Sequence, residues 1–519
     1  YIKATTESHG DVGDKGNDNL RIDAAEIRAK VLGEGANLAI TQRGRIEFAE
    51  RGGKLNADFI DNSGGVDSSD NEVNIKILLG DVVSRKEHDM DIEKRNKLLE
   101  RMTDEVAALV LNHNYQQTQG ISLLEMRAAE RMAHHGLFIR YLEKQAGLNR
   151  KIEYLPDEEE IEARVQSGKG LTRPELGIMI AYSKIRLTKD LLESDLPDDL
   201  SCQNKWLINY FPRPLREKYR AEILTHRLGR EITATMLANQ VIDRMGPTFV
   251  KTRMDKTGES CAAIVQAYIT VLEAFQLHKL WDKLEALDNK VPAQVQLKAM
   301  REIGRMAKRE TTWFLTRLAR PLDIAADIAL FGDGVAELSK GFDKLVTKKI
   351  RNGIDQRAQS YINDGLPAPL AKQIARVPEM GAACDIIRIS HECGTAIDIT
   401  AQVYFELGEF FHIDWLQRQA RFLDVEDNWS QEALASLSEQ LYSSQAGLTS
   451  RILHDMGDKI KKRKLGGRGQ PGIVAAWMEE HRQQTSQFEP LFNEIQKEGS
   501  VDLPMLIIAE QRLRQLYGG

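Results

Sequence analysis

The chain is 519 residues long, more than the roughly 250–300 residues that one hydrophobic core organises, so we expect more than one folded unit. Hydrophobic residues make up 42% and charged residues 29% of the sequence, a composition typical of globular proteins and not of disordered ones. The formal net charge of -6 gives no overall attraction to nucleic acid or to an anionic membrane, and we predict neither partner.

The cysteines are few and far apart in the sequence, without a CxxC pair: Cys202, Cys261, Cys384 and Cys393. This usage favours reduced thiols and predicts a cytoplasmic location. Cys384 and Cys393 lie near His391, but the group lacks the paired spacing and the fourth ligand of usual metal sites, so no metal is predicted.

The first part of the chain alternates short helical and extended patterns. Residues 23–29 and 42–51 are predicted to be short helices, and residues 29–32 and 56–61 are predicted to be strands. A further helix is expected to open at GGV, near Gly65. The order αβαβα within about sixty residues is typical of a parallel sheet covered by helices. Residues 1–19 contain no evident strand or helix nucleus, and with Tyr1 as first residue we expect a chain cut from a longer one.

After about residue 85 the strand signals end, and long amphipathic stretches predict a region that is nearly all α. The clearest boundary is in LTRPELG, where Thr172 is the predicted N-cap and Glu175 completes a capping box. The prediction is a mainly α fold, with a large multi-helix C-terminal region preceded by the C-terminal αβαβα edge of a Rossmann-type α/β domain. We place the boundary between residues 88 and 89, with subdivisions of 89–519 near 290 and 428.

Two polar turns follow the two predicted strands. Ligands of open α/β sheets gather beyond the carboxyl ends of the strands, so we expect the turns bearing Asn37 and Asn62 to lie side by side there. Glycines let the backbone approach a flat ligand, and asparagine amides donate and accept at once. Gly/Asn turns are also common wherever the backbone needs a positive φ, so spacing alone leaves both interpretations open.

The same residues resemble a known family. EGANLAIT, followed about twenty residues later by DNSGGVDSSDNE, is similar to the end of the nucleotide-binding domain of glutamate dehydrogenases. ESHGDVGDKGND and TQRGRIEFA more closely resemble the large bacterial NAD-specific members of that family, and LTRPELGIMIAYSK and VYFELGEFFHIDWL resemble their helical C-terminal region. The resemblance spans essentially the whole chain.

The resemblance implies oxidative deamination of L-glutamate to 2-oxoglutarate and ammonia, with NAD as cofactor, in a homo-oligomer. Matched residue by residue, it assigns the cofactor side to Gly35, Ala36, Asn37 and Asn62. It assigns the substrate side, near the side-chain carboxylate of glutamate, to Val66 and Ser69.

Two departures from the family pattern shape the expectation. The family continues EGAN with Gly-Pro-Thr-Thr, whereas Leu38 to Thr41 read Leu-Ala-Ile-Thr here. The family's catalytic lysine, acid–base aspartate and glycine-rich phosphate loop would lie upstream of Tyr1, so no catalytic residue is assigned and the chain alone is expected to be inactive. The alternative hypothesis is a non-enzymatic helical scaffold or a regulatory or oligomerisation module.

Three further patterns each have a structural alternative to a functional one. The basic cluster either forms an anion pocket or bridges helices through carboxylates, and we favour bridging for its members Arg213, Arg216, Arg220, His226, Arg227 and Arg230. The basic run 459–472 is interpreted as a solvated helix end. The aromatic residues between Tyr404 and Trp415 are predicted to be core.

Overall fold

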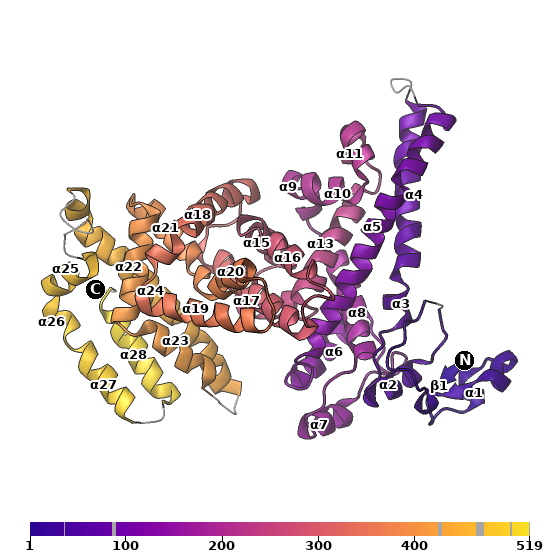
Figure 1. The fold of residues 1–519 in the computed structure, drawn as a ribbon, viewed down its shortest axis with the longest axis horizontal. Helices are drawn as coiled ribbons and strands as arrows, with labels where there is room; N and C mark the ends of the chain where they lie inside the picture. Colours follow the sequence, from indigo (N-terminus) through magenta and orange to yellow (C-terminus); the bar gives the residue numbers. More distant parts are fainter. Residues whose placement is uncertain (36, 86–89, 424–427, 463–471, 499–500, 518–519) are drawn as a thin grey trace. The chain divides into compact units, whose positions relative to one another are not determined.

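The computed structural model describes residues 1–35, 37–85, 90–423, 428–462, 472–498 and 501–517. It is mostly helical, as predicted, and divides by contacts into two compact units (Figure 1). Unit 1 comprises Tyr1–Thr270 with Thr311–Ala325, and unit 2 comprises Val271–Glu310 with Ala326–Gly519.

Unit 1 begins with short elements. They are β1 (Ile2–Lys3), α1 (His9–Val12), η1 (Lys15–Leu20), β2 (Ile22–Asp23), η2 (Ala24–Glu26), α2 (Gln42–Glu50) and α3 (Asp58–Asp61). Longer helices follow, namely α4 (Ser63–Ser84), α5 (Ile92–Glu125), α6 (Met132–Ala146), α7 (Glu158–Gln166) and α8 (Arg173–Leu192). The rest are η3 (Leu196–Asp198), α9 (Leu200–Cys202), the π-helical turn η4 (Gln203–Leu207), α10 (Ile208–Tyr210), α11 (Arg213–Lys218), α12 (Arg220–Leu224), α13 (Gly229–Met245) and α14 (Phe249–Thr257).

Helices α15 (Cys261–Ala274) and α17 (Ala293–Arg317) each contribute to both units. Helix α18 (Ile324–Leu345) begins in unit 1 and continues from Ala326 in unit 2. The described part of unit 2 is otherwise made of α16 (Leu277–Glu285), α19 (Lys348–Asn363), α20 (Ala368–Met380), α21 (Ala383–Cys393), α22 (Ile397–Phe410), α23 (Ile413–Phe422), α24 (Asn428–Lys461), α25 (Ile473–Glu480), α26 (Arg482–Thr485), α27 (Phe488–Lys497) and α28 (Leu503–Gln515).

The predicted parallel sheet is largely absent from the described residues. β1 and β2 pair in parallel, with Ile2 opposite Ile22, and single bridges join Ile2 to Ile40 and Val31 to Lys54. The predicted strand 29–32 is therefore reduced to one bridge. The short strand and helix within residues 1–19 were not predicted, although the capping box between Ser8 and Asp11 is visible in the sequence.

The strand prediction for residues 56–61 is wrong. Residues 58–61 form α3, which begins after the extended Ala57. The carbonyl of Ala57 accepts from the amides of Ile60 and Asp61, at 3.0 and 3.1 Å, so the backbone is satisfied locally. A strand at this place would have exposed these groups with no neighbouring strand to pair them.

Helix α4, which follows α3 directly, is fixed by an apolar face. Its side chains at helical spacing, Ile75, Leu78, Leu79 and Val82, are buried against Met102 of α5 and the apolar residues between Leu207 and Ile223. Figure 1 shows α4 and α5 side by side along most of the length of α4. This packing anchors the C-terminal half of α4, the helix that follows the second polar turn.

Candidate functional site

The first polar turn is built around a buried carboxylate. Glu34 accepts two hydrogen bonds from Arg45, from Nε and Nη2, both at 2.7 Å, and a third from the backbone amide of Ile40 at 3.2 Å. Glu34 and Arg45 are both buried. Bidentate pairing of this kind fixes direction as well as distance, so Arg45 of α2 determines the path of the turn.

Helix α3 supplies the contacts that bring the two turns together. Asp61 accepts a hydrogen bond from the backbone amide of Glu34 at 3.1 Å, and Asp58 accepts one from the amide of Leu38 at 3.1 Å. Arg45 also lies 3.3 Å from Asp58. The carboxylates of α3, which leads into the second turn, therefore bind the backbone of the first turn.

The two asparagines meet directly. Nδ2 of Asn62 donates to Oδ1 of Asn37 at 2.8 Å. The structure thus places the two turns side by side, as expected, although α3 holds them there and not a sheet. A Cβ added at Gly35 would meet no atom within 4 Å, so this face of the first turn is open. Ala36 lies outside the described residues.

The other two predicted residues lie on the first turns of α4. Val66 is 64% exposed, and Ser69 is also exposed. The Ser69 hydroxyl makes only a long hydrogen bond to the carbonyl of Gly65, at 3.4 Å, whereas the neighbouring Ser68 hydroxyl donates to the carbonyl of Gly64 at 2.7 Å. Of the two hydroxyls, that of Ser69 is the less committed to the helix and the more available to a ligand.

Two residues that the sequence analysis did not identify, Asn114 and Arg173, stabilise the second turn and the segment that leads into it. Nδ2 of Asn114, on α5, donates to the carbonyl of Ile60 at 2.8 Å and to the Ser63 hydroxyl at 2.9 Å. Arg173, the first residue of α8, donates to Asn56 at 3.0 Å and pairs with Glu125 at 2.9 Å. The sequence signal for Arg173 was its place in LTRPELG, but nothing local indicated its partner.

Three charged side chains, those of Lys54, Glu125 and Arg173, lie together next to these supporting contacts. Burial raises the pKa of Glu125, but hydrogen bonds from Lys54 and Arg173 outweigh it, and the net effect lowers the pKa below the usual value. Glu125 therefore remains ionised at neutral pH. It ties the segment after α2 to α5 and α8.

A cavity of about 400 Å³ adjoins the exposed start of α4. It is lined by residues of α4, α5, η4, α10 and α13. Asp67, Asp70 and Asn71 of this lining belong to the quoted stretch DNSGGVDSSDNE, but no role was predicted for them. Nδ1 of His113 lies 2.7 Å from Asp67, and burial raises the pKa of Asp70, with a contribution from the charge of Asp67. A mainly apolar cavity that carries a few charged groups thus adjoins the helix of Val66 and Ser69.

Other sequence hypotheses have mixed outcomes. The bridging interpretation of the basic cluster is confirmed for Arg216, which joins α11 to Glu105 of α5 at 3.1 Å, and for Arg227, which pairs with Asp81 of α4. Arg213 instead pairs with Glu217 within α11, at 2.6 Å. No group of three or more His, Cys, Asp or Glu side chains suited to a metal occurs in the described part of the chain. Most of the run 459–472 lies outside the described residues.

Membrane-spanning potential is limited in the described ranges. No single helix there has the length and apolar character needed to cross a bilayer. The bent pair Cys261–Ala274 and Leu277–Glu285 passes the same test jointly, by length and composition alone.

Fold and site together define a predominantly helical protein that carries two joined, amide-bearing turns in unit 1. Residues 168–515 match the model of the family described as "Glutamate dehydrogenase, C-terminal", and residues 1–124 match "Bacterial NAD-glutamate dehydrogenase, catalytic domain". The chain belongs to the bacterial NAD-specific glutamate dehydrogenase family.

Individual relatives agree with the family models. Over 516 residues, 99% of the chain, it is 40% identical to an NAD-specific glutamate dehydrogenase of Pseudomonas aeruginosa. It is 38% identical to one of Halomonas elongata and 32% identical to one of Mycobacterium tuberculosis over the same length. The chain spans only 31% of the length of each of these relatives.

Proposed function

We propose that this chain is part of an NAD-dependent enzyme that converts L-glutamate, NAD and water to 2-oxoglutarate, ammonia and NADH. The main support is the similarity to NAD-specific glutamate dehydrogenases over 99% of the chain. On this proposal residues 1–88 are the end of the NAD-binding catalytic domain; the catalytic-domain match covers these residues and extends to residue 124. Residues 89–519 are then the helical C-terminal region of a homo-oligomer in the cytoplasm.

The first turn and Asn62 would hold the cofactor. Once their mutual hydrogen bond is made, Asn37 still has an amide donor and Asn62 still has a carbonyl acceptor, the pair of groups that a carboxamide needs. The open face at Gly35 leaves room for a flat ring, and we propose Ala36 as the adjoining contact. The residues present therefore fit a nicotinamide. NAD, when bound, supplies the acceptor for the hydride that leaves glutamate.

Val66 and Ser69 would contact the substrate. The Ser69 hydroxyl can donate to the side-chain carboxylate of glutamate, and a charged acceptor makes such a hydrogen bond about twice as strong as a neutral one. Val66, 64% exposed and one helical turn before Ser69, offers apolar surface to the methylene groups of the same side chain.

The chain alone is proposed not to turn over glutamate. The reaction requires a lysine to polarise the carbonyl or activate water and a carboxylate to move protons. No residue of this sequence could be matched to either role. The role of this chain in the reaction would then be to orient the cofactor and the substrate.

The test uses Ser69→Ala in the full-length enzyme, with the Michaelis constant for glutamate as the readout. Loss of a hydrogen bond to a charged group is expected to raise that constant about tenfold or more. Ser68→Ala is the matched control, because its hydroxyl is committed to Gly64, and should leave the constant unchanged. An unchanged value for Ser69→Ala would remove this residue from the substrate site.

The scaffold hypothesis makes the opposite prediction for the full-length protein. It expects no reduction of NAD in the presence of glutamate. The dehydrogenase proposal requires that reduction, so a single spectrophotometric assay of NADH separates the two.

A further inference from the structure

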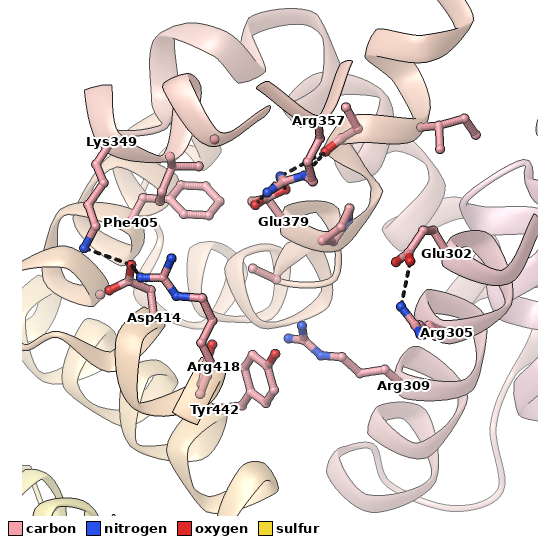
Figure 2. Close-up of a pocket in the computed structure, with 18 of the residues that line it drawn as sticks. Glu302, Arg305, Arg309, Lys349, Arg357, Glu379, Phe405, Asp414, Arg418 and Tyr442 are labelled. Carbon is pink, nitrogen blue, oxygen red and sulfur yellow. Dashed lines mark hydrogen bonds and ion pairs between the residues drawn. The ribbon is translucent and has the colours of Figure 1, made fainter. Parts of the chain in front are cut away.

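A second cavity, of about 390 Å³, lies entirely within unit 2. Its lining residues come from α17, α19, α20, α22, α23 and α24 (Figure 2). Its volume falls within the roughly 300–1,000 Å³ usual for small-molecule sites. The proposed cofactor and substrate residues all lie in unit 1, so this cavity goes beyond the proposed function.

The lining carries more positive than negative charge. The cations are Lys298, Arg305, Arg309, Lys349, Arg357 and Arg418. The acids are Glu302, Glu379 and Asp414, so six cations face three carboxylates. A surplus of positive charge in a concave site of low dielectric favours an anionic occupant.

Several of these cations are already neutralised by a neighbour. Arg357 pairs with Glu379 at 2.6 Å, and Arg305 pairs with Glu302 at 2.6 Å. Figure 2 shows these two pairs at separate places on the cavity wall. Within each pair, the charged ends of the two side chains face each other. They give the cavity its shape and contribute little net charge to its centre.

Arg309 is different. Its guanidinium lies 3.7 Å from the centroid of the Tyr442 ring, and the nearest carboxylate recorded in the described part of the chain, that of Glu310, is 3.5 Å from Nε. Burial raises the pKa of Glu310 to about 7, so this carboxyl neutralises Arg309 only in part. Arg309 and Tyr442 point toward one another in Figure 2, from α17 and α24.

A buried hydroxyl lines the same cavity. Tyr404 is 2% exposed, and its hydroxyl has no hydrogen-bond partner among the described residues. A buried polar group without a partner is costly, which is why most such groups in proteins are paired. Tyr404, on α22, lines the same cavity as Arg309 of α17 and Tyr442 of α24, so this unused donor and the guanidinium face one ligand space.

We propose that this cavity binds a small organic anion through its phosphate or carboxylate oxygens, which accept hydrogen bonds from Arg309 and from the Tyr404 hydroxyl. The guanidinium offers a planar fork that matches either kind of oxygen group. The ring of Tyr442 holds that fork in place, and Phe405 of the same wall offers apolar contact to the rest of the ligand.

The test is calorimetric titration of the 519-residue chain with three probes, namely inorganic phosphate, adenosine monophosphate and succinate. Binding of the first two but not of succinate would identify phosphate chemistry, and binding of succinate alone would identify carboxylate chemistry. Binding of the monophosphate but not of inorganic phosphate would show that the organic part is needed. All three results support the proposal, whereas binding of no probe overturns it.

Variants tie the binding to the named residues. Arg309→Gln is expected to weaken binding about tenfold to a hundredfold, as for loss of a hydrogen bond to a charged group. Tyr404→Phe keeps the ring and is expected to weaken binding severalfold while leaving thermal stability without ligand unchanged or higher. Arg482→Gln, which removes an exposed cation of the same unit, is the charge-matched control and should bind as the parent chain does.

Two outcomes of the variant series overturn the proposal. One is unchanged affinity in both Arg309→Gln and Tyr404→Phe. The other is an equal loss in Arg482→Gln, which would reduce the effect to overall charge. Because Tyr404→Phe removes only one oxygen atom, its result remains decisive even if Arg309→Gln does not fold.

Discussion

The N-terminal segment (residues 1–62) and the C-terminal bundle (residues 389–516) are stabilised in different ways. The buried apolar cluster of the segment has four members, Ala24, Ile40, Phe48 and Leu55, whereas that of the bundle has 24 members among the described residues. The segment instead contains buried or half-buried ionic contacts, between Glu34 and Arg45 and between Lys3 and Asp23.

The difference follows from what each kind of contact provides. Apolar burial is roughly proportional to area and has no direction, so it suits a thick bundle of helices. Hydrogen bonds and ion pairs add little net stability, but they fix the orientation of the groups they join. In the segment, the second kind of contact sets the angle at which the Asn37 and Asn62 amides meet, whereas the bundle is held mainly by apolar burial.

The largest expected effect is in the bundle. Phe411 is fully buried among other rings, and Phe411→Ala should lower the local free energy of unfolding by about 3 to 5 kcal/mol because it leaves a large cavity. The measurement is hydrogen–deuterium exchange of the amides of α24. The adjacent Phe410, 46% exposed, is the matched control, and Phe410→Ala should cost less than about 1 kcal/mol. Equal losses would contradict an apolar origin of the bundle's stability.

The second effect tests the polar origin of the segment's stability. Arg45→Met leaves the buried Glu34 carboxylate without its cation, and we expect a loss of about 3 kcal/mol in the local free energy of unfolding. Exchange of the Leu38 and Ile40 amides, which donate to Asp58 and Glu34, reports it directly.

Two companion variants sharpen this result. Arg51→Met removes an arginine of the same region that is 58% exposed and should change exchange little. Adding Glu34→Leu to Arg45→Met removes the unpaired charge and should recover most of the loss. If the double variant were as unstable as the single one, the ion pair would not be the origin of the effect.

Features of the fold that depend only on residues close together in the sequence could be predicted from the sequence. The start of α8 is one example, because Thr172 and Glu175 form the predicted capping box within four residues. Helix breaks that no nearby residue indicates could not be predicted from the sequence. Residues 258–287 look like one helix, yet the chain breaks between α15 and α16, where Gln276 adopts a positive φ of 49° without any Gly or Pro nearby.

The candidate site was predicted in part, and for a partly wrong reason. The turns of Asn37 and Asn62 were expected to meet at a sheet edge, and they do meet, but through the carboxylates of Asp58 and Asp61 on a helix. The Arg309 and Tyr404 cavity was not predictable, because its walls come from helices distant in the sequence and only tertiary packing brings them together.

The smallest expected effect concerns a buried polar group in the helical part of unit 1. His135 of α6 is 4% exposed, and burial, with smaller contributions from Arg131 and His134, lowers its pKa from 6.5 to about 4. The folded state keeps the ring neutral while the unfolded state takes up a proton as the pH falls below 6.5. The stabilisation is therefore fully present above pH 6.5 and is lost as the pH falls toward 4. It amounts to about 2 kcal/mol between pH 7.5 and pH 5.

His135→Leu should remove this part of the pH dependence of urea unfolding, whereas His134→Leu, at the exposed neighbour, should retain most of it. An identical pH dependence in His135→Leu and the parent chain would mean that the buried imidazole does not couple folding to protonation.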